Sequence, residues 1–188
     1  MCRQIGALGV CVAILPAPLS RGTSFRLTNA KPYPVRLQQV EAVWTDYDGQ
    51  LKMAYYGVMF DRAADELFTE LGCGADYIKR TNCSIFVLET HTSYANELIA
   101  GEHVRIENRI IGFDQKRVHF VQQMFRADSL YLACVLEVMM AHVDLTTRRT
   151  SAFPPEILNR IEAMAKTHAG LPTPPQMGHV IGLPNIKK

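Results

Sequence analysis

The stretch at residues 44–67, WTDYDGQLKMAYYGVMFDRAADEL, joins a tight turn to an amphipathic helix. Its DYDGQ segment, at residues 46–50, contains two carboxylates and a glycine, a composition typical of turns. The apolar residues after it recur at steps of three and four, the period of one helix face: Tyr56, Phe60, Ala63, Leu67 and Leu71. The pattern predicts a helix over residues 53–71 with an acidic turn at its N-terminus.

Three glycines add detail to this helix. Gly72 and Gly74 follow the last apolar residue of the pattern and predict the C-terminal end. Gly57 lies inside the pattern, where glycine costs about 1 kcal/mol relative to alanine. We therefore expect another group to pack closely against Gly57.

The residues after the helix favour an antiparallel sheet. Four segments are rich in β-branched and aromatic residues and are joined by short connections: 83–93, 103–113, 117–125 and 130–145. Apolar and polar residues also alternate at positions 35–44, which predicts a strand before the turn.

A last amphipathic helix is expected after residue 153. Pro154 and Pro155 suit its first turn, and Ile157, Ile161 and Met164 fall on one face. One long helix against a curved antiparallel sheet is a two-layer α+β fold.

Composition limits the classes of protein that remain. The 188 residues fit one domain, and 48% hydrophobic with 20% charged residues provides for an ordinary core. A net charge of +2 predicts no general attraction to nucleic acid or to a membrane surface. The five cysteines form no C-x-x-C pair, so they indicate neither a zinc site nor a disulfide framework. This usage is typical of a reducing compartment, and we expect a cytoplasmic protein.

The two ends of the chain differ from its middle. Residues 1–34 contain four prolines and an apolar run that is too short to span a bilayer. We expect a flexible extension there, with a weak secretory signal as the alternative. Residues 35–169 form the predicted domain. Residues 170–188 contain four prolines and no acidic residue, and we expect an extended tail.

Four blocks of the sequence carry a family resemblance. They are the opening stretch, SIFVLETHTSYANELIAGEHVRI at 84–106, DQKRVHF at 114–120 and LEVMMAHVDLTTRRTSAFP at 136–154. Together they resemble the hotdog-fold acyl-CoA thioesterases of the 4-hydroxybenzoyl-CoA thioesterase type, and within them the betainyl-CoA branch of carnitine degradation. The resemblance covers roughly residues 38–164. It implies an oligomeric hotdog fold, in which a curved antiparallel sheet wraps a long central helix.

The turn departs from that family at three positions. Members commonly have D-Y-N-G-H-M-N, whereas this chain has Asp48, Gln50 and Lys52 in place of Asn, His and Asn. In the 4-hydroxybenzoyl-CoA enzyme an aspartate at this place carries the chemistry, so the resemblance implies that Asp48 is catalytic. Spacing alone would favour a simple turn role for Asp48. We expect Asp46 to hold the turn by hydrogen bonds.

Hydrolysis of a thioester needs a group that stabilises the oxyanion and a group that attacks the carbonyl. The N-terminus of the predicted helix offers free N–H groups and a partial positive charge near residues 53–55. One such donor stabilises a transition state by about 3 kcal/mol in other enzymes. Asp48 would act as nucleophile, through an anhydride, or as general base toward water. The sequence leaves both roles open.

Three residues near the turn are candidates for substrate contacts. Gln50 would position water or the thioester carbonyl, or be an exposed amide. Tyr55 and Tyr56, beside Trp44 and Phe60, would offer aromatic faces to a trimethylammonium group. The alternative for the aromatic side chains is packing in the core.

Two more candidates lie on a predicted strand. Glu89 and His91 alternate along it and so share one face. They would orient water or substrate if that face meets the turn of a partner subunit, or else form a structural ion pair. His119 and His142 lie on other predicted strands, and the three histidines show no compact ligand spacing, so we expect no metal site.

The resemblance also implies a CoA site. Lys116 and Arg117 lie at a predicted hairpin turn that meets CoA phosphates in the resembled family, and such side chains favour phosphate. A solvated turn is the alternative. Arg148 and Arg149 are a second basic pair.

The expected protein hydrolyses a small acyl-CoA, with betainyl-CoA as one candidate, to free acid and CoA. It needs no cofactor, works as a homodimer or homotetramer, and has no nucleic-acid or membrane partner. Two alternatives remain. One is a hotdog dehydratase or hydratase, which needs a histidine base. The other is a non-catalytic acyl-CoA or acyl-carrier binding protein, which Gln50 and Lys52 favour.

Overall fold

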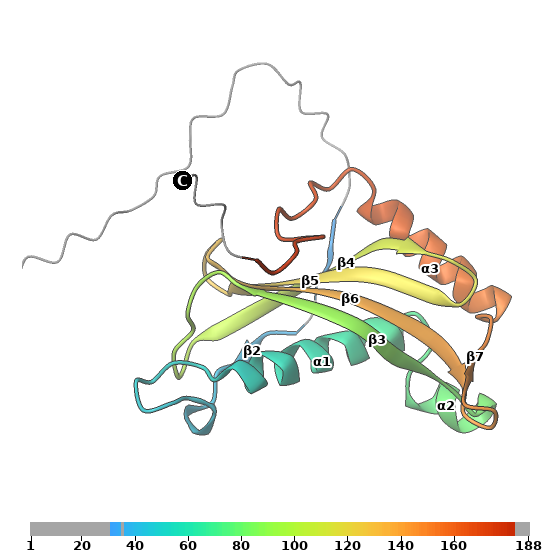
Figure 1. Cartoon of the computed structure of the whole chain (residues 1–188), viewed down its shortest axis with the longest axis horizontal. Coiled ribbons are helices and arrows are strands. Elements are labelled where there is room, and N and C mark those ends of the chain that lie inside the picture. Colours follow the sequence, from blue (N-terminus) through green and yellow to red (C-terminus); the bar gives the residue numbers. More distant parts are fainter. Residues whose placement is uncertain (1–30, 35, 183–188) are drawn as a thin grey trace, which may run out of the picture.

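A long helix packs against one face of a curved antiparallel sheet in the computed structural model, which describes residues 31–34 and 36–182 (Figure 1). The helix is α1, Met53–Glu70, and it agrees with the predicted span. It ends where predicted, because Gly72 adopts a positive φ of 89° just beyond it. The predicted two-layer α+β architecture is confirmed.

The sheet has the strand order β1-β4-β5-β6-β3, and every pairing in it is antiparallel. Its four long strands agree closely with the predicted segments: β3 Cys83–Tyr94, β4 His103–Phe113, β5 Arg117–Arg126 and β6 Leu132–Asp144. Two short strands extend this path, since β2, Gln38–Gln39, pairs with β4 and β7, Arg149–Thr150, pairs with β6.

The strand predicted over residues 35–44 is confirmed only at Gln38–Gln39 and is wrong for the residues that follow. After β2 the chain forms a short 3-10 helix, η1, Ala42–Trp44. Val40 bonds to the β3–β4 connection, with its N–H donating to Glu102 and its carbonyl accepting from Gly101. The backbone then turns so that Trp44 enters the core with 7% of its surface exposed. The alternation of apolar and polar residues at positions 35–44 therefore does not mark a continuous strand, because the backbone turns there. Residue 35 lies outside the described residues.

Two elements near the sheet were not predicted. Helix α2, Ala75–Thr81, follows α1 and ends at Asn82, which adopts the left-handed conformation with φ 52°. Strand β1, Tyr33–Pro34, pairs with β4 although it lies in the segment expected to be an extension. The sheet thus begins a few residues earlier than the sequence indicates.

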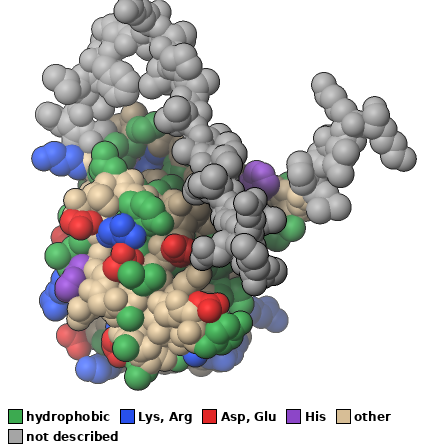
Figure 2. All heavy atoms as spheres, turned by 90° about the vertical axis from the view of Figure 1, so that its left-hand side faces the viewer, with side chains coloured by type: hydrophobic (Ala, Val, Ile, Leu, Met, Phe, Trp, Pro, Cys, Tyr) green, Lys and Arg blue, Asp and Glu red, His purple; other side chains and the backbone are tan. Residues whose placement is uncertain are grey.

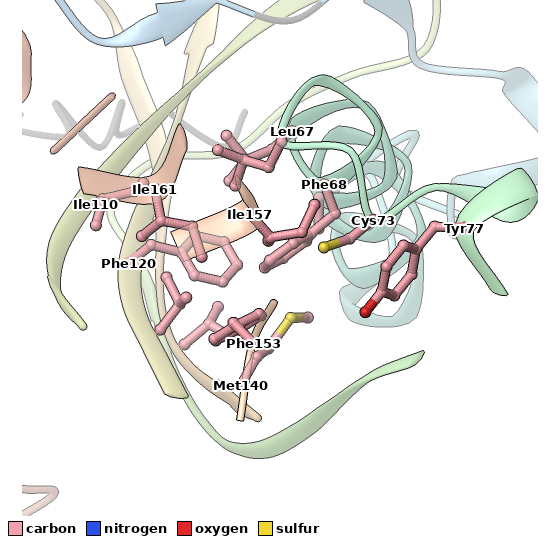
Figure 3. Close-up of a cluster of buried hydrophobic side chains, with 14 residues drawn as sticks. Leu67, Phe68, Cys73, Tyr77, Ile110, Phe120, Met140, Phe153, Ile157 and Ile161 are labelled. Atoms are coloured by element: carbon pink, nitrogen blue, oxygen red, sulfur yellow. The ribbon is translucent and has the colours of Figure 1, made fainter. Parts of the chain in front are cut away.

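A cluster of buried hydrophobic side chains fixes the C-terminal end of α1. Its side chains come from the C-terminal half of α1, from the sheet and from α3, Pro155–His168, and they point toward one another (Figure 3). Helix α3 begins at the predicted prolines, and its Ile157 and Ile161 are 3% and 0% exposed. Burial of side chains of this size contributes about 1.5–3 kcal/mol each.

Two buried amides hold α1 in one position along the sheet. Gln122 of β5 donates to the carbonyl of Phe60 and to Oδ1 of Asn108, at 3.1 and 2.8 Å. Asn108 of β4 in turn donates to the carbonyl of Ala63 at 3.4 Å. Because buried amides are costly when their partners are lost, this network resists sliding of the helix. The N-terminus of α1 is therefore held at a defined place.

The expectation about Gly57 is wrong. A Cβ added there would meet no atom within 4 Å, so no described group packs closely against it. Gly57 faces open space on the exposed side of α1.

In the described part of the chain, no helix is both long and apolar enough to cross a bilayer.

Candidate active site

The acidic turn is built around Asp46, as predicted. Its Oδ1 accepts hydrogen bonds from the backbone N–H groups of Asp48 and Gln50, at 2.9 and 3.0 Å. The N–H of Gly49 donates to the Asp46 carbonyl, and Gly49 adopts a positive φ of 79°. Asp46 thus folds the turn and leaves the Asp48 carboxylate free of it.

Backbone contacts attach this turn to the start of α1 and to the β3–β4 connection. The N–H of Leu51 donates to the Leu98 carbonyl at 2.7 Å, and Gln50 forms a bridge with Ile99. The N–H of Lys52, the N-cap of α1, donates to the Trp44 carbonyl at 3.0 Å. These contacts position the turn directly before the first N–H groups of the helix.

The N-terminus of α1 is available to a ligand. The Lys52 side chain makes no capping hydrogen bond, and the first turn contains no acidic residue. The N–H of Tyr55 donates to the Lys52 carbonyl at 2.9 Å, whereas the N–H groups of Met53 and Ala54 have no hydrogen-bond partner in the described part of the chain. These two amides keep their hydrogen-bonding capacity at the positive end of the helix dipole. Asp48 and Gln50 are both exposed beside it. Figure 2 views this end of the molecule, where acidic, basic and hydrophobic side chains are interspersed.

The aromatic residues near the turn pack against the chain itself. The rings of Trp44 and Tyr55 stack with centroids 5.3 Å apart, and the Arg62 guanidinium lies 5.2 Å from the Trp44 ring. Tyr56 is buried and meets Tyr94 edge to face at 5.2 Å. Burial raises the pKa of Tyr56 to about 12. The geometry favours core packing over an open cage around a cation, and Arg62, which the sequence did not single out, already occupies the Trp44 face.

Glu89 and His91 share a face, as predicted, but the structure does not bring them to the turn of their own chain. They pair across from Met139 and Glu137. The alternate residues of β6 pack toward α1: Leu136, Val138 and Met140. Both candidates therefore point away from α1. Their neighbours there include His119, whose Nε2 lies 2.8 Å from Glu137.

The histidines on the strands have other partners. His142 is buried, with Nε2 at 2.8 Å from the Tyr77 hydroxyl and Nδ1 at 2.9 Å from the Ser151 hydroxyl. Among the described residues, no three His, Cys, Asp or Glu side chains converge as metal ligands would.

Lys116 and Arg117 lie on the β4–β5 hairpin, where Asp114 organises them. Its carboxylate accepts from both backbone amides at 2.8 Å and pairs with the Arg117 guanidinium at 2.7 Å. These hydrogen bonds hold the pKa of Asp114 below its usual range. The hairpin borders a cavity of about 510 Å³ that also contacts Leu88 of β3. Asp114 was not among the residues predicted from the sequence. Its carboxylate would compete with a phosphate group for the Arg117 guanidinium.

The hairpin and the acidic turn lie at opposite ends of the sheet in one chain (Figure 1). Strand β5 begins at Arg117 and ends at Arg126, whose guanidinium pairs with Glu102 near the turn. Ten extended residues span about 33 Å. One chain alone therefore does not bring Asp48 together with Lys116 and Arg117.

Comparisons with known proteins give one consistent family. Residues 40–161 match the model of the thioesterase-like superfamily. A betainyl-CoA thioesterase from Pseudomonas aeruginosa is 34% identical over 144 residues, which are 77% of this chain and 91% of that protein. An L-carnitine dehydrogenase/betainyl-CoA thioesterase from a Rhizobium species is 29% identical over 156 residues, which are 83% of this chain but 31% of that longer protein.

Solved structures agree with the family. A hypothetical protein from Staphylococcus aureus in complex with CoA superposes with a TM-score of 0.78 at 28% identity, covering 82% of this chain and 98% of that one. A thioesterase described as putative, from Pseudomonas putida KT2440, superposes with a TM-score of 0.72 at 31% identity and covers 81% of this chain and 97% of its own. The predicted hotdog fold and the predicted class of thioester hydrolase are confirmed. This chain belongs to the thioesterase-like superfamily.

Proposed function

We propose that this protein hydrolyses a small acyl-CoA to free acid and CoA at a site that starts from Asp48. The observation that carries the proposal is the turn itself, which presents an exposed carboxylate directly before the uncapped N-terminus of α1. The helix amides would stabilise the oxyanion, and Asp48 would attack the carbonyl or activate water. Gln50 and Tyr55, beside the same helix start, would contact the acyl group, and the buried Tyr56 would support them from below.

The active unit is proposed to be a homodimer paired through β3. This strand lies at one end of the strand order, and its outer edge meets no described strand. Phe86, Val87 and Leu88 on it are 37%, 52% and 52% exposed. An exposed apolar edge strand pairs readily with another chain, and a two-fold axis makes two such edges antiparallel.

Antiparallel pairing of the β3 edges would assemble the site from two chains. The end of β3 near the acidic turn of one chain would then lie beside the start of β3 in its partner. The start of β3 is close to the hairpin that carries Lys116 and Arg117, because Phe86 of β3 and Arg117 of β5 both pair with Ala141 of β6. The CoA phosphates would bind there, with Lys116 as the freer cation. Arg148, over the ring of Phe86 at 5.5 Å, lies at the same edge.

Glu89 and His91 stay outside this proposed site, since both point away from α1. Betainyl-CoA is the first substrate to test because of the names of the curated relatives. The described cysteines, Cys73, Cys83 and Cys134, are free thiols, which supports a reducing compartment such as the cytoplasm.

Release of CoA from a panel of acyl-CoAs tests the proposal. The wild-type protein should hydrolyse at least one short acyl-CoA, and Asp48→Asn should lower kcat about 100-fold or more while leaving the fold intact. Asp61→Asn, an exposed aspartate on α1, is the matched control and should remain active. An active Asp48→Asn would refute the role of Asp48. Tight acyl-CoA binding without turnover in the wild type would instead indicate a binding protein.

A further inference from the structure

A wide surface cavity lies far from the acidic turn. It has a volume of about 710 Å³ and is lined by β1, by the C-terminal end of α1 and by α3. Helix α1 spans 18 residues, or about 27 Å, from its first turn to this cavity. The cavity is therefore separate from the proposed catalytic site.

A buried histidine forms part of the cavity wall. Strand β1 pairs with β4 only at Asn108 and Glu107. Beyond this pairing, His168 of α3 contacts the backbone of β4. Its Nδ1 accepts a hydrogen bond from the N–H of Ile110 at 3.0 Å. Burial and the nearby Arg109 lower the pKa of His168, so its ring is neutral. A neutral imidazole that accepts at Nδ1 carries its proton on Nε2.

That Nε2–H is a donor without a recorded acceptor among the described residues. His168 is only 2% exposed and borders the cavity. A neutral imidazole in this wall offers one hydrogen-bond donor and no charge to a bound molecule. Because the same ring also completes the edge of β4, its orientation is fixed before any ligand binds.

The remaining wall combines an apolar surface with an excess of positive charge. Leu71, Ala163 and Met164 supply the apolar part, while Arg160 and Lys31 supply two cations against the single carboxylate of Glu70. Gly72 leaves room for Arg160, because a Cβ there would lie 2.5 Å from its Nη1. This combination suits a molecule with an apolar body and one negative charge.

We propose that this cavity is a second binding site, for a small organic acid. The carboxylate pairs with the Arg160 guanidinium, and the apolar body packs along Leu71 and Met164 toward the ring of His168. Binding in this cavity does not involve Asp48 and can be tested separately from the proposed hydrolysis.

Calorimetric titration of the full chain with three matched probes tests the site. Phenylacetate should bind saturably with a Kd of about 1 mM or tighter. Phenylacetamide, which has the same shape without the charge, and 2-phenylethylamine, which has the opposite charge, should bind at least about tenfold more weakly. Equal binding of phenylacetate and phenylacetamide, or no saturation by phenylacetate, would overturn the proposal.

Variants locate the binding. Arg160→Gln should weaken phenylacetate at least about tenfold, and Ala163→Phe should abolish binding by filling the cavity. Arg149→Gln, an exposed arginine on β7, and Asp48→Asn should both bind as the wild type does. Both cavity variants alter positions on the exposed side of α3, so folding should be retained, and circular dichroism checks this. Loss of binding in Asp48→Asn with retention in Arg160→Gln would refute the cavity as the site.

Discussion

Two carboxylates lie two residues apart on the acidic turn and have different surroundings. One carboxylate oxygen of Asp46 accepts hydrogen bonds from two backbone N–H groups, whereas Asp48 is exposed beside the start of α1. Asp46→Ala should therefore release the turn and lower kcat, with only a small loss of global stability because the turn is at the surface. Steady-state hydrolysis together with thermal unfolding measures both effects.

Asp46→Asn is the informative control for that variant. Asparagine keeps an acceptor oxygen at the same place, so Asp46→Asn should retain most activity. The same substitution at Asp48 removes the negative charge and should abolish turnover. If Asp46→Asn and Asp48→Asn were equally inactive, the structural role of Asp46 would be wrong.

The sequence predicts residue roles well where they depend on near neighbours. The turn function of Asp46 follows from an Asp and a Gly three positions apart, and its partners lie within four residues. The orientation of Glu89 and His91 could not be predicted in the same way. Period-two alternation puts them on one face, but which face packs on α1 depends on pairing with β6 and on a bulge after Val87.

Helix α1 contains one glycine that no other part of the described chain contacts closely. Gly57 has no atom within 4 Å of an added Cβ and does not adopt a positive φ. Gly57→Ala should raise the free energy of unfolding by about 1 kcal/mol, because alanine restricts the unfolded chain and favours the helix. Urea denaturation measures this change. Ala163→Gly on α3 is the reverse control and should lower the free energy of unfolding by a similar amount.

The opposite result at Gly57 would also be informative. If Gly57→Ala left the fold intact but weakened subunit association or substrate binding, a group from outside the chain would have to approach this glycine. Stability should then be unchanged or higher while the Kd of the dimer or the KM rises.

Long elements were predictable and short ones were not, for a physical reason. Helix α1 and strand β4 each bury a repeating face, so their periodicity is visible over ten or more residues. The other three long strands are ten to thirteen residues long, which is enough for their β-branched and aromatic composition to predict them. Strand β1 and the 3-10 helix η1 cover two and three residues, too few for a period. Their conformations depend on distant contacts, such as the N–H of Val40 with the Glu102 carbonyl.

Two buried histidines should make the stability of the whole protein sensitive to mild acid. Burial lowers the pKa of His142 and of His168 below the ordinary value of 6.5. The unfolded chain therefore takes up protons first as the pH falls through 6.5. The free energy of unfolding should be constant just above that pH and should decrease below it, until the pH reaches the lowered folded values.

Urea denaturation between about pH 8 and pH 5 measures this dependence. Each histidine contributes at most about 1.4 kcal/mol per pH unit within the window. His168→Gln keeps an acceptor for the N–H of Ile110 and should make the decrease smaller. A free energy of unfolding that rises on acidification would contradict the assignment.

The arrangement of the whole sheet makes the two-chain site testable by mixing. One inactive variant, Asp48→Asn, keeps its basic hairpin, and a second, Lys116→Ala with Arg117→Ala, keeps its Asp48. If the site combines Asp48 of one chain with the hairpin of its partner, each mixed dimer contains one intact site and one site that lacks both contributions. Unfolding and refolding the two variants together should then restore about a quarter of the wild-type activity, because half of the dimers are mixed and each has one intact site.

Two further observations decide whether that recovery has the proposed cause. Val87→Lys on the β3 edge should give monomers near 21.1 kDa by light scattering and should abolish activity. Leu130→Lys, at a residue that is 87% exposed on the β5–β6 connection, should change neither property. If the site lay within one chain, mixing would restore nothing, and a Val87→Lys monomer would retain turnover. Because the acidic turn and the basic hairpin are about 33 Å apart in one chain, we expect activity and association to be lost together.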